Sequence, residues 1–340
     1  MINPAIKQKK SFESLIVAAF ALVLLTTIIF VTGSRDLSVG TDTIAYLEIF
    51  RIIAAGYETR FEYGFVGIVK FISYFTLSPF IYFSVFTLIV LASYILLYFT
   101  IIDWRWGERE NSDLFLILGL LLSSSWFVVA VINGLRQGMS LPWVYLSLFL
   151  LIRKKYFYSG ISFLISAGFH LSVFSLIPFF ILLILKRIWL FSLIFLAAIF
   201  YPLGINENII RLVSSLLGVP VYEFIASYGI ESGLWVGFQL DLYVYSVFWL
   251  ILFLCLEGFI KDKYIEKWQV LVNMYGVLLL PFFVLGFGGF SNRFGYIAWF
   301  FLPACFAAFI IWSKFSVRIK FFMGFAWFCF GVFYFFSYFI

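Results

Sequence analysis

The chain has 340 residues, of which 64% are hydrophobic and only 12% are charged. A water-soluble domain of this length cannot bury so much apolar surface, so the composition indicates a membrane protein. The formal net charge is +6, but basic residues in such a chain mainly fix its orientation, and we expect no nucleic-acid partner. The three cysteines form no CxxC pair, so neither a disulfide framework nor a zinc site is predicted.

The chain begins with three lysines followed by a long apolar run. No small-residue cleavage site clearly follows this run, so we expect an uncleaved first helix at 13–33 rather than a signal peptide. Residues 34–63 carry mixed charge and are predicted to form an outer loop. Residues 64–78 are apolar but short and contain Lys70, which favours an interfacial or re-entrant segment over a span.

Runs of about 20 apolar residues cross a bilayer, and the chain holds about eleven candidates. We place them at 13–33, 79–102, 114–132, 138–152, 156–170, 171–185, 188–205, 237–259, 268–287, 294–313 and 321–339. They leave a second outer loop at 206–236, with two short helices separated by Gly218-Val219-Pro220. We therefore predict an all-α polytopic membrane protein that forms one transmembrane domain over 1–340.

The distribution of lysine and arginine sets the predicted orientation, because loops rich in these residues stay in the cytoplasm. With the N-terminus inside, most of the 23 basic residues fall on the inner side, including the knot Arg153-Lys154-Lys155. The basic residues left on the outer side are Arg35, Arg51, Arg60, Lys70, Arg136, Arg211 and Arg293. The predicted N-terminus is therefore cytoplasmic.

Two polar stripes mark neighbouring predicted helices at this outer face. Asn133, Arg136, Gln137 and Ser140 follow the spacing i, i+3, i+4 and i+7, and Ser162, Ser166 and His170 follow i, i+4 and i+8. The serines are interpreted mainly as hydrogen-bonding contacts between helices. Arg136 could snorkel to headgroups, but its amide neighbours and the short following span favour a functional role.

A cationic site is predicted where distant segments meet at the outer face. Arg35, Arg136 and Arg293 supply guanidinium groups, His170 is the sole histidine, and Asp42 and Glu62 supply carboxylates. Arginines suit an anionic, phosphate-bearing substrate, and an imidazole suits proton transfer near neutral pH. The sequence has no P-loop, no outer DxD pair and no HExxH motif, so we expect metal-independent chemistry and no cofactor.

Several motifs together resemble the EpsG family of Wzy-type polymerases of bacterial surface polysaccharides. They are Arg35, Gly40-Thr41-Asp42, Tyr46, Phe50, Glu62-Tyr63-Gly64, Asn133-Gly134-Leu135-Arg136-Gln137 and Ala167-Gly168-Phe169-His170-Leu171-Ser172. The later stretch Arg293-Phe294-Gly295-Tyr296 is also similar to that family. The resemblance is best over 30–180 and rests on the order and spacing of motifs that are weak one by one.

This resemblance implies a GT-C-like glycosyltransferase in the inner (cytoplasmic) membrane of a bacterium, which joins oligosaccharide repeat units carried on undecaprenyl pyrophosphate at the outer face. Donor and acceptor are both lipid-linked, undecaprenyl pyrophosphate leaves, and the partners implied are the lipid bilayer and a chain-length regulator protein. For the base we favour His170, with Asp42 and Glu62 as rivals. The residues expected to bind the diphosphate or the sugar are Arg35, Arg136, Arg293, Asn133, Gln137 and Tyr46.

Three other functions remain open from the sequence. A ligase that transfers finished polysaccharide to another lipid would use similar residues. A membrane acyltransferase also uses a membrane histidine, but it would carry a second catalytic polar residue beside it and would not need three arginines. A lipid-linked sugar flippase predicts charges at mid-membrane and internal repeats, and the sequence shows neither.

Overall fold

The computed structural model describes residues 4–102, 112–230, 237–289 and 291–339. These residues form helices and no strand, apart from one isolated bridge between Ile260 and Ser313. The predicted all-helical fold is therefore confirmed for this part of the chain. The inner loop predicted at 103–113 and the end of the outer loop at 231–236 lie almost wholly outside the described residues, as do the side chains of the N-terminal lysines.

The chain divides into two compact units, which we describe separately. Unit 1 contains α1 (Pro4–Gly33), α2 (Thr43–Ala54), α3 (Tyr63–Phe75), α4 (Pro79–Ile101), α5 (Ser112–Leu122), α6 (Ser125–Ile132), α7 (Leu135–Ile152), α8 (Tyr156–Phe169) and α17 (Val317–Phe336). Unit 2 contains α9 (Ile177–Phe180), α10 (Arg187–Phe200), α11 (Ile205–Leu217), α12 (Val221–Ile230), α13 (Leu240–Leu256), α14 (Ile265–Leu285) and α15 (Ser291–Trp299). Residues of α16 (Leu302–Trp312) belong to both units.

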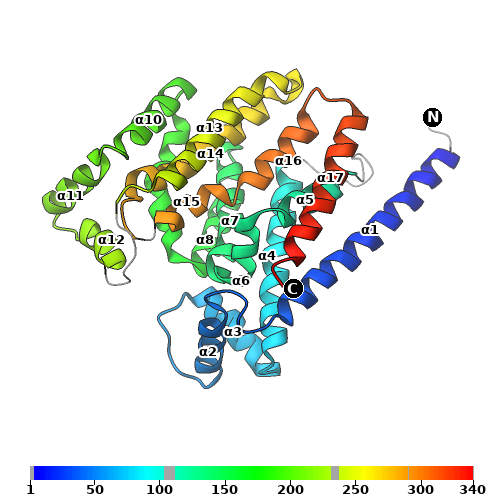
Figure 1. The fold of residues 1–340 in the computed structure, drawn as a ribbon, viewed down its shortest axis with the longest axis horizontal. Coiled ribbons are helices and arrows are strands. Elements are labelled where there is room, and N and C mark those ends of the chain that lie inside the picture. Colours follow the sequence, from blue (N-terminus) through cyan, green and yellow to red (C-terminus); the bar gives the residue numbers. More distant parts are fainter. Residues whose placement is uncertain (1–3, 103–111, 231–236, 290, 340) are drawn as a thin grey trace. The chain divides into compact units, whose positions relative to one another are not determined.

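Unit 1 is built around α4 and α7. Helix α4 packs against α1, α3, α6 and α7, and its aromatic side chains Tyr82, Phe86 and Tyr94 are fully buried. It begins at Pro79, a residue suited to a first helical turn because that turn's N–H groups have no partner in the helix. Helices α2 and α3 lie together beside the start of α4 (Figure 1).

Helices α7 and α8 form a hairpin that two pairs of serines hold together. The Oγ atoms of Ser140 and Ser166 are 2.7 Å apart, and those of Ser147 and Ser159 are 3.2 Å apart. Each of these hydroxyls also donates to the backbone carbonyl of its partner. Ser140 and Ser166 are thus interhelical contacts, as their sequence interpretation favoured, whereas Ser162, interpreted in the same way, donates to the carbonyl of Tyr158 in its own helix.

The segment predicted as the first outer loop is more ordered than expected, because it contains α2. Tyr46, Phe50 and Ile53 follow a helical spacing and are buried on one face of this helix. The next segment, predicted not to span, forms α3, which has 13 residues. At about 1.5 Å per residue, α3 is roughly 20 Å long, which is shorter than the roughly 30 Å hydrocarbon core of a bilayer.

Unit 2 is built around α14, whose side chains from Trp268 to Phe283 are mostly buried. Helices α10, α11, α13 and α15 pack against it. At one end, the guanidinium of Arg187 makes two hydrogen bonds to the carboxylate of Glu257, which also accepts one from Gln269. The predicted break at Gly218-Val219-Pro220 is confirmed: it separates α11 from α12, and Gly218 has φ +63°.

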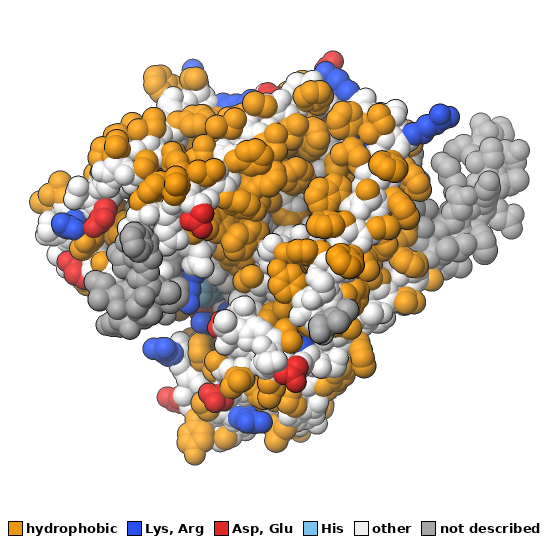
Figure 2. Space-filling view, viewed as in Figure 1, with side chains coloured by type: hydrophobic (Ala, Val, Ile, Leu, Met, Phe, Trp, Pro, Cys, Tyr) orange, Lys and Arg blue, Asp and Glu red, His pale blue; other side chains and the backbone are white. Residues whose placement is uncertain are grey.

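Six helical segments in the described part of the chain are long and apolar enough to cross a membrane, or eight if each of two bent pairs counts as one span. The bent pairs are α5 with α6, at 69°, and α10 with α11, at 97°. The predicted segments at 156–170 and 171–185 fall below this length because α8 has 14 residues and 171–184 is mostly 3-10 helix. Hydrophobic side chains occupy large areas of the face in Figure 2, as expected for a multi-pass membrane protein.

Candidate functional site

The candidate site lies in unit 1 and is centred on the carboxylate of Glu62. Glu62 is the N-cap residue of α3, a position where acidic side chains commonly accept hydrogen bonds from the first turn. Its side chain makes no such bond and is only 7% exposed. A buried carboxylate that does not cap its own helix must find its partners elsewhere.

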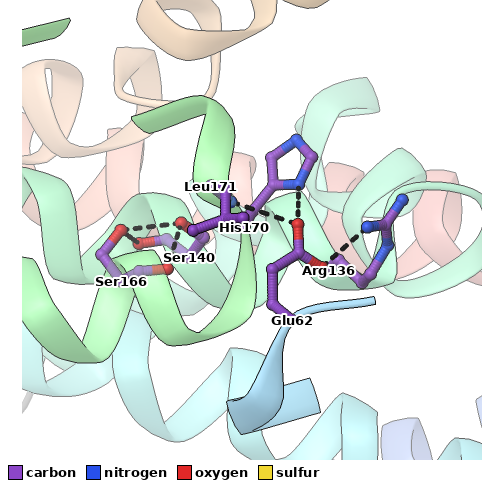
Figure 3. A network of polar contacts seen from close by, with 6 residues as sticks. All are labelled: Glu62, Arg136, Ser140, Ser166, His170 and Leu171. Atoms are coloured by element: carbon purple, nitrogen blue, oxygen red, sulfur yellow. Dashed lines mark hydrogen bonds and ion pairs between the residues drawn. The ribbon is translucent and has the colours of Figure 1, made fainter. Parts of the chain in front are cut away.

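Three donors from two other helices surround this carboxylate (Figure 3). Oε2 of Glu62 accepts a hydrogen bond of 2.8 Å from Nη1 of Arg136, at the start of α7. Oε1 lies 3.2 Å from Nδ1 of His170 and accepts a bond of 3.1 Å from the backbone N–H of Leu171, just after α8. The cluster Glu62, Arg136 and His170 therefore joins the ends of α3, α7 and α8.

These hydrogen bonds decide the protonation of Glu62. Burial alone would raise the pKa of its carboxyl, but the bonds from His170 and Arg136 and the charge of Arg136 outweigh it. Together they lower the pKa of Glu62 from 4.5 to about 2. Glu62 is therefore ionised at neutral pH and has little tendency to take up a proton.

Arg136 lies near the positive end of the α7 dipole, in the first turn of that helix. Its guanidinium stacks on the ring of Phe61, 4.5 Å from the centroid, and its side chain is 25% exposed. Nε of Arg136 is buried and has no hydrogen-bond partner among the described residues. A ligand can therefore reach Arg136 only through the exposed part of its side chain, not through Nε.

His170 follows the last residue of α8 and has an extended backbone, with φ −157° and ψ 110°. Its side chain is 22% exposed. Since Glu62 is ionised, Nδ1 must carry the proton in the contact between them. The second ring nitrogen, Nε2, lies on the side of the ring away from Glu62 (Figure 3). In the neutral imidazole, Nε2 is then a proton acceptor.

A close approach of two backbones brings the cluster together. Helices α3 and α8 pack against each other, and a Cβ atom added at Gly64 would lie 2.5 Å from the carbonyl oxygen of Gly168. Any larger residue at Gly64 would push the two helices apart. Because Glu62 precedes this contact and His170 follows it, the Gly64–Gly168 contact sets the distance between the carboxylate and the imidazole.

Asp42 and Asn133, predicted as base and substrate ligand, contact each other. Oδ1 of Asn133 accepts a hydrogen bond of 3.4 Å from the backbone N–H of Asp42. Gly40, with φ +85°, lies against Ile132 and Asn133 and leaves no room for a Cβ atom. Asn133 therefore fixes the loop before α2. The carboxylate of Asp42 accepts a hydrogen bond from Thr41.

Arg35, predicted to bind a diphosphate, is buried and makes contacts within the protein. It is 7% exposed and stacks on Phe83, 3.7 Å from the ring centroid. Its guanidinium donates to the carbonyls of Thr32 and Val131 and to the hydroxyl of Thr43. Burial lowers the pKa of Arg35 to about 10, so it remains charged at neutral pH. Arg35 fastens the end of α1 to α2 and α6.

Of the other predicted ligands, Tyr46 and Gln137 lie in unit 1 and Arg293 lies in unit 2. Tyr46 is buried on α2 and interacts with Arg136, and burial raises the pKa of its hydroxyl despite that positive charge. Gln137 follows Arg136 in the first turn of α7 and is partly buried. Arg293 lies in the first turn of α15, in unit 2, so its presence beside the Glu62 cluster stays a prediction.

Two features of the site were not predicted from the sequence. The first is that the carboxylate of Glu62 contacts both Arg136 and His170. The second is the contact of Gly64 with Gly168, although both glycines stand within the motifs that carry the family resemblance. Among the described residues, no three His, Cys, Asp or Glu side chains lie close enough together to hold a metal ion.

An all-helical fold with six to eight candidate spans, and a buried ionic cluster at the ends of three helices, define a polytopic membrane protein with a polar site. Residues 18–340 match the family model described as the EpsG family. The chain therefore belongs to the EpsG family, as its motifs predicted, a family associated with Wzy-like polymerisation of polysaccharides. Comparisons with curated proteins and with solved structures give no match.

Proposed function

We propose that the chain is a polymerase of bacterial surface polysaccharides, which joins repeat units carried on undecaprenyl pyrophosphate. The observation that carries this proposal is the cluster of Glu62, Arg136 and His170 in a member of the EpsG family. It combines a cation for an anionic leaving group with an imidazole that has one free nitrogen. Glycosyl transfer from a diphosphate needs both functions.

Arg136 binds the diphosphate of the donor in this proposal. Its side chain is 25% exposed, and its place in the first turn of α7 adds the helix dipole to its charge. A guanidinium has five N–H donors, so Arg136 can keep its bond to Glu62 while it binds phosphate oxygens. Fixed positive charge of this kind stabilises a leaving diphosphate without a metal ion.

His170 is the general base, and Glu62 orients it. Nε2 of His170 takes the proton from a hydroxyl group of the acceptor unit while the hydroxyl oxygen bonds to the anomeric carbon of the growing chain. The bond between that carbon and the diphosphate oxygen breaks, and its electron pair leaves with undecaprenyl pyrophosphate. The lowered pKa of Glu62 argues against Glu62 as the base and in favour of an orienting role.

The remaining predictions complete the proposal. The reaction takes place at the outer face of the bacterial inner membrane, with the N-terminus in the cytoplasm, and Gln137, Tyr46 and Arg293 contribute to substrate binding. Asp42 and Asn133 hold the loop before α2 in place and so act on the site indirectly. In a GT-C-like layout of eleven spans, α1, α8 and the segment 171–184 would cross in addition to the eight candidates, and α10 would be the part of the bent pair α10–α11 that crosses.

The test is polymerisation by the purified protein of a defined undecaprenyl-pyrophosphate-linked repeat unit. We expect a ladder of longer products, which Arg136→Ala or His170→Ala lowers by about 10²-fold or more, the usual contribution of such groups. Arg60→Ala, an exposed arginine of the same unit, is the control and should keep full activity.

Normal ladders from both variants would refute the site. Transfer of one finished chain to a different lipid, without elongation, would indicate a ligase instead.

A further inference from the structure

Helix α11 of unit 2 has three distinct faces. Asn206 and Ser214 are buried against the protein, whereas Ile209, Leu212, Val213 and Leu216 form an exposed apolar stripe at a spacing of three and four residues. On the other side of the exposed surface lie Glu207, Asn208, Arg211 and Ser215. The apolar stripe is well exposed, with Leu216 at 74% and Leu212 at 58%. Hydrophobic and charged side chains both reach the surface over α11 (Figure 2).

A bend before α11 sets the axis of α11 nearly perpendicular to the axis of α10. Helix α10 is apolar, and α11 departs from it at 97°, so α11 adds almost no length along the axis of α10. Asn206 holds this bend in place, because its Nδ2 donates to the carbonyls of Ala197 on α10 and Phe283 on α14, both at 2.8 Å. Where α10 crosses the membrane, α11 must run along the membrane plane.

The polar face of α11 is electrically balanced. Oε1 of Glu207 accepts hydrogen bonds from Arg211, at 3.1 Å, and from the hydroxyl of Tyr222 on α12, at 3.0 Å. The guanidinium of Arg211 also stacks on the ring of Tyr222. This pairing leaves no unpaired charge for an acidic protein or an anionic lipid to recognise, so attraction must come from the apolar stripe.

We propose that α11 lies in the membrane–water interface, with its apolar stripe among the lipid acyl chains and its polar face toward water. A helix with opposed apolar and polar exposed faces is suited to this position. The occupant of the stripe is therefore the bilayer, which already surrounds α10, and a second protein is not needed to cover it. Because Glu207 and Arg211 are paired, the immersion does not depend on anionic lipid.

Spin labels on the full-length protein in phospholipid nanodiscs test this proposal. Val213→Cys and Leu216→Cys probe the apolar stripe, and Asn208→Cys and Ser215→Cys are matched positions on the polar face. The exposed Cys255 and Cys329 are first replaced by serine. Collisions with oxygen report the acyl region, and collisions with a water-soluble nickel complex report the aqueous phase.

We expect oxygen collisions to dominate at 213 and 216 and nickel collisions to dominate at 208 and 215. The pattern should be the same in phosphatidylcholine discs and in discs that also contain phosphatidylglycerol. Nickel access at all four positions would overturn the proposal. Labels at 213 and 216 that neither reagent reaches would also overturn it, because protein would then cover the stripe. A pattern that appears only with phosphatidylglycerol would refute the independence from anionic lipid.

Discussion

At the scale of single residues, the tautomer of His170 is the central feature of the site. An ionised Glu62 can only accept hydrogen bonds, so the proton of the imidazole is drawn to Nδ1 and the lone pair remains on Nε2. The N–H of Leu171 shares Oε1 with the imidazole and restricts the carboxylate to one orientation. The side chain of His170 is thereby oriented before any substrate arrives.

The ionisation of Glu62 gives a prediction for stability against pH. Its pKa is about 2 in the folded protein and near 4.5 when unpaired, so the unfolded chain binds the extra proton between these values. Stability from Glu62 is thus complete above about pH 4.5 and is lost as the pH falls toward 2. The stability difference between the wild type and Glu62→Gln should be constant above that range and shrink below it by on the order of 3 kcal/mol.

The measurement is thermal or denaturant unfolding of the two purified proteins in detergent across this pH range. Glu58→Gln is the matched control, since Glu58 is exposed in the same loop and should follow the wild type. A difference between wild type and Glu62→Gln that stays constant down to pH 2 would contradict the assigned ionisation.

The same substitution gives a prediction for catalysis. In Glu62→Gln, the side-chain amide nitrogen can donate to the imidazole and favour the opposite tautomer, which puts the proton on Nε2. We expect kcat to fall by about 10²-fold or more while KM for the lipid-linked unit changes little, as steady-state assays would show. A change confined to KM would instead place Glu62 in substrate binding.

At the scale of helices, the crossing of α3 with α8 determines whether the site forms. A Cβ atom at Gly64 would lie against the carbonyl of Gly168, whereas a Cβ atom at Gly168 would meet nothing closer than 3.9 Å, the Cα atom of Gly64. Gly64→Ala should therefore cost about 1–3 kcal/mol of stability and lower activity by separating Glu62 from His170.

Gly168→Ala is the internal control for this prediction. It makes the same chemical change on the facing helix and should leave both stability and polymer length close to the wild type. The unfolding curves and product ladders of the two variants are compared. Equal losses of stability and activity in both variants would show that the close contact of α3 with α8 does not determine whether the site forms.

The serine pairs give a second prediction at this scale. Ser140 and Ser166 hold α7 and α8 together through buried hydrogen bonds, so Ser140→Ala should destabilise the protein by about 1 kcal/mol. Ser192→Ala removes a hydroxyl that bonds only within its own helix and should have a smaller effect in the same unfolding assay. A larger loss of stability in Ser192→Ala than in Ser140→Ala would show that the Ser140–Ser166 pair does not hold the hairpin together.

At the scale of the whole molecule, the proposed orientation can be tested by labelling. Tyr63 is 96% exposed beside Glu62, and Lys154 is exposed in the turn between α7 and α8. A cysteine at 63 should react with an impermeant maleimide added to intact spheroplasts, and a cysteine at 154 should react only after the membrane is opened. The reverse result would invert the topology and move the site to the cytoplasmic face.

Much of this architecture could be predicted from residue patterns. Hydrophobic runs predicted the long helices, and Gly218-Val219-Pro220 predicted the break between α11 and α12, because glycine and proline end helices for local reasons. The structure brings together Arg136, His170 and Glu62, which the sequence analysis had assigned to one outer-face site.

Other features depend on contacts between distant segments, which residue patterns do not encode. Arg35 was proposed as a substrate ligand from its charge, and nothing in the neighbouring sequence indicates that its guanidinium contacts the carbonyl of Val131 and the ring of Phe83. The helix α2 was also missed, because its segment was predicted to be part of an outer loop. For α2, the spacing of Tyr46, Phe50 and Ile53 was a helical signal that the surrounding charges obscured.

The bond from Arg35 to Val131 also limits the order in which the protein can be assembled during synthesis. Its two partners are separated by 96 positions, so the guanidinium leaves the ribosome long before its acceptor exists. Until α6 has been made, that charge must stay hydrated or among headgroups, since an unpaired cation is costly in hydrocarbon. The N-terminal helix can therefore be inserted early, but it reaches its final packed position only after more than a third of the polypeptide has been translated.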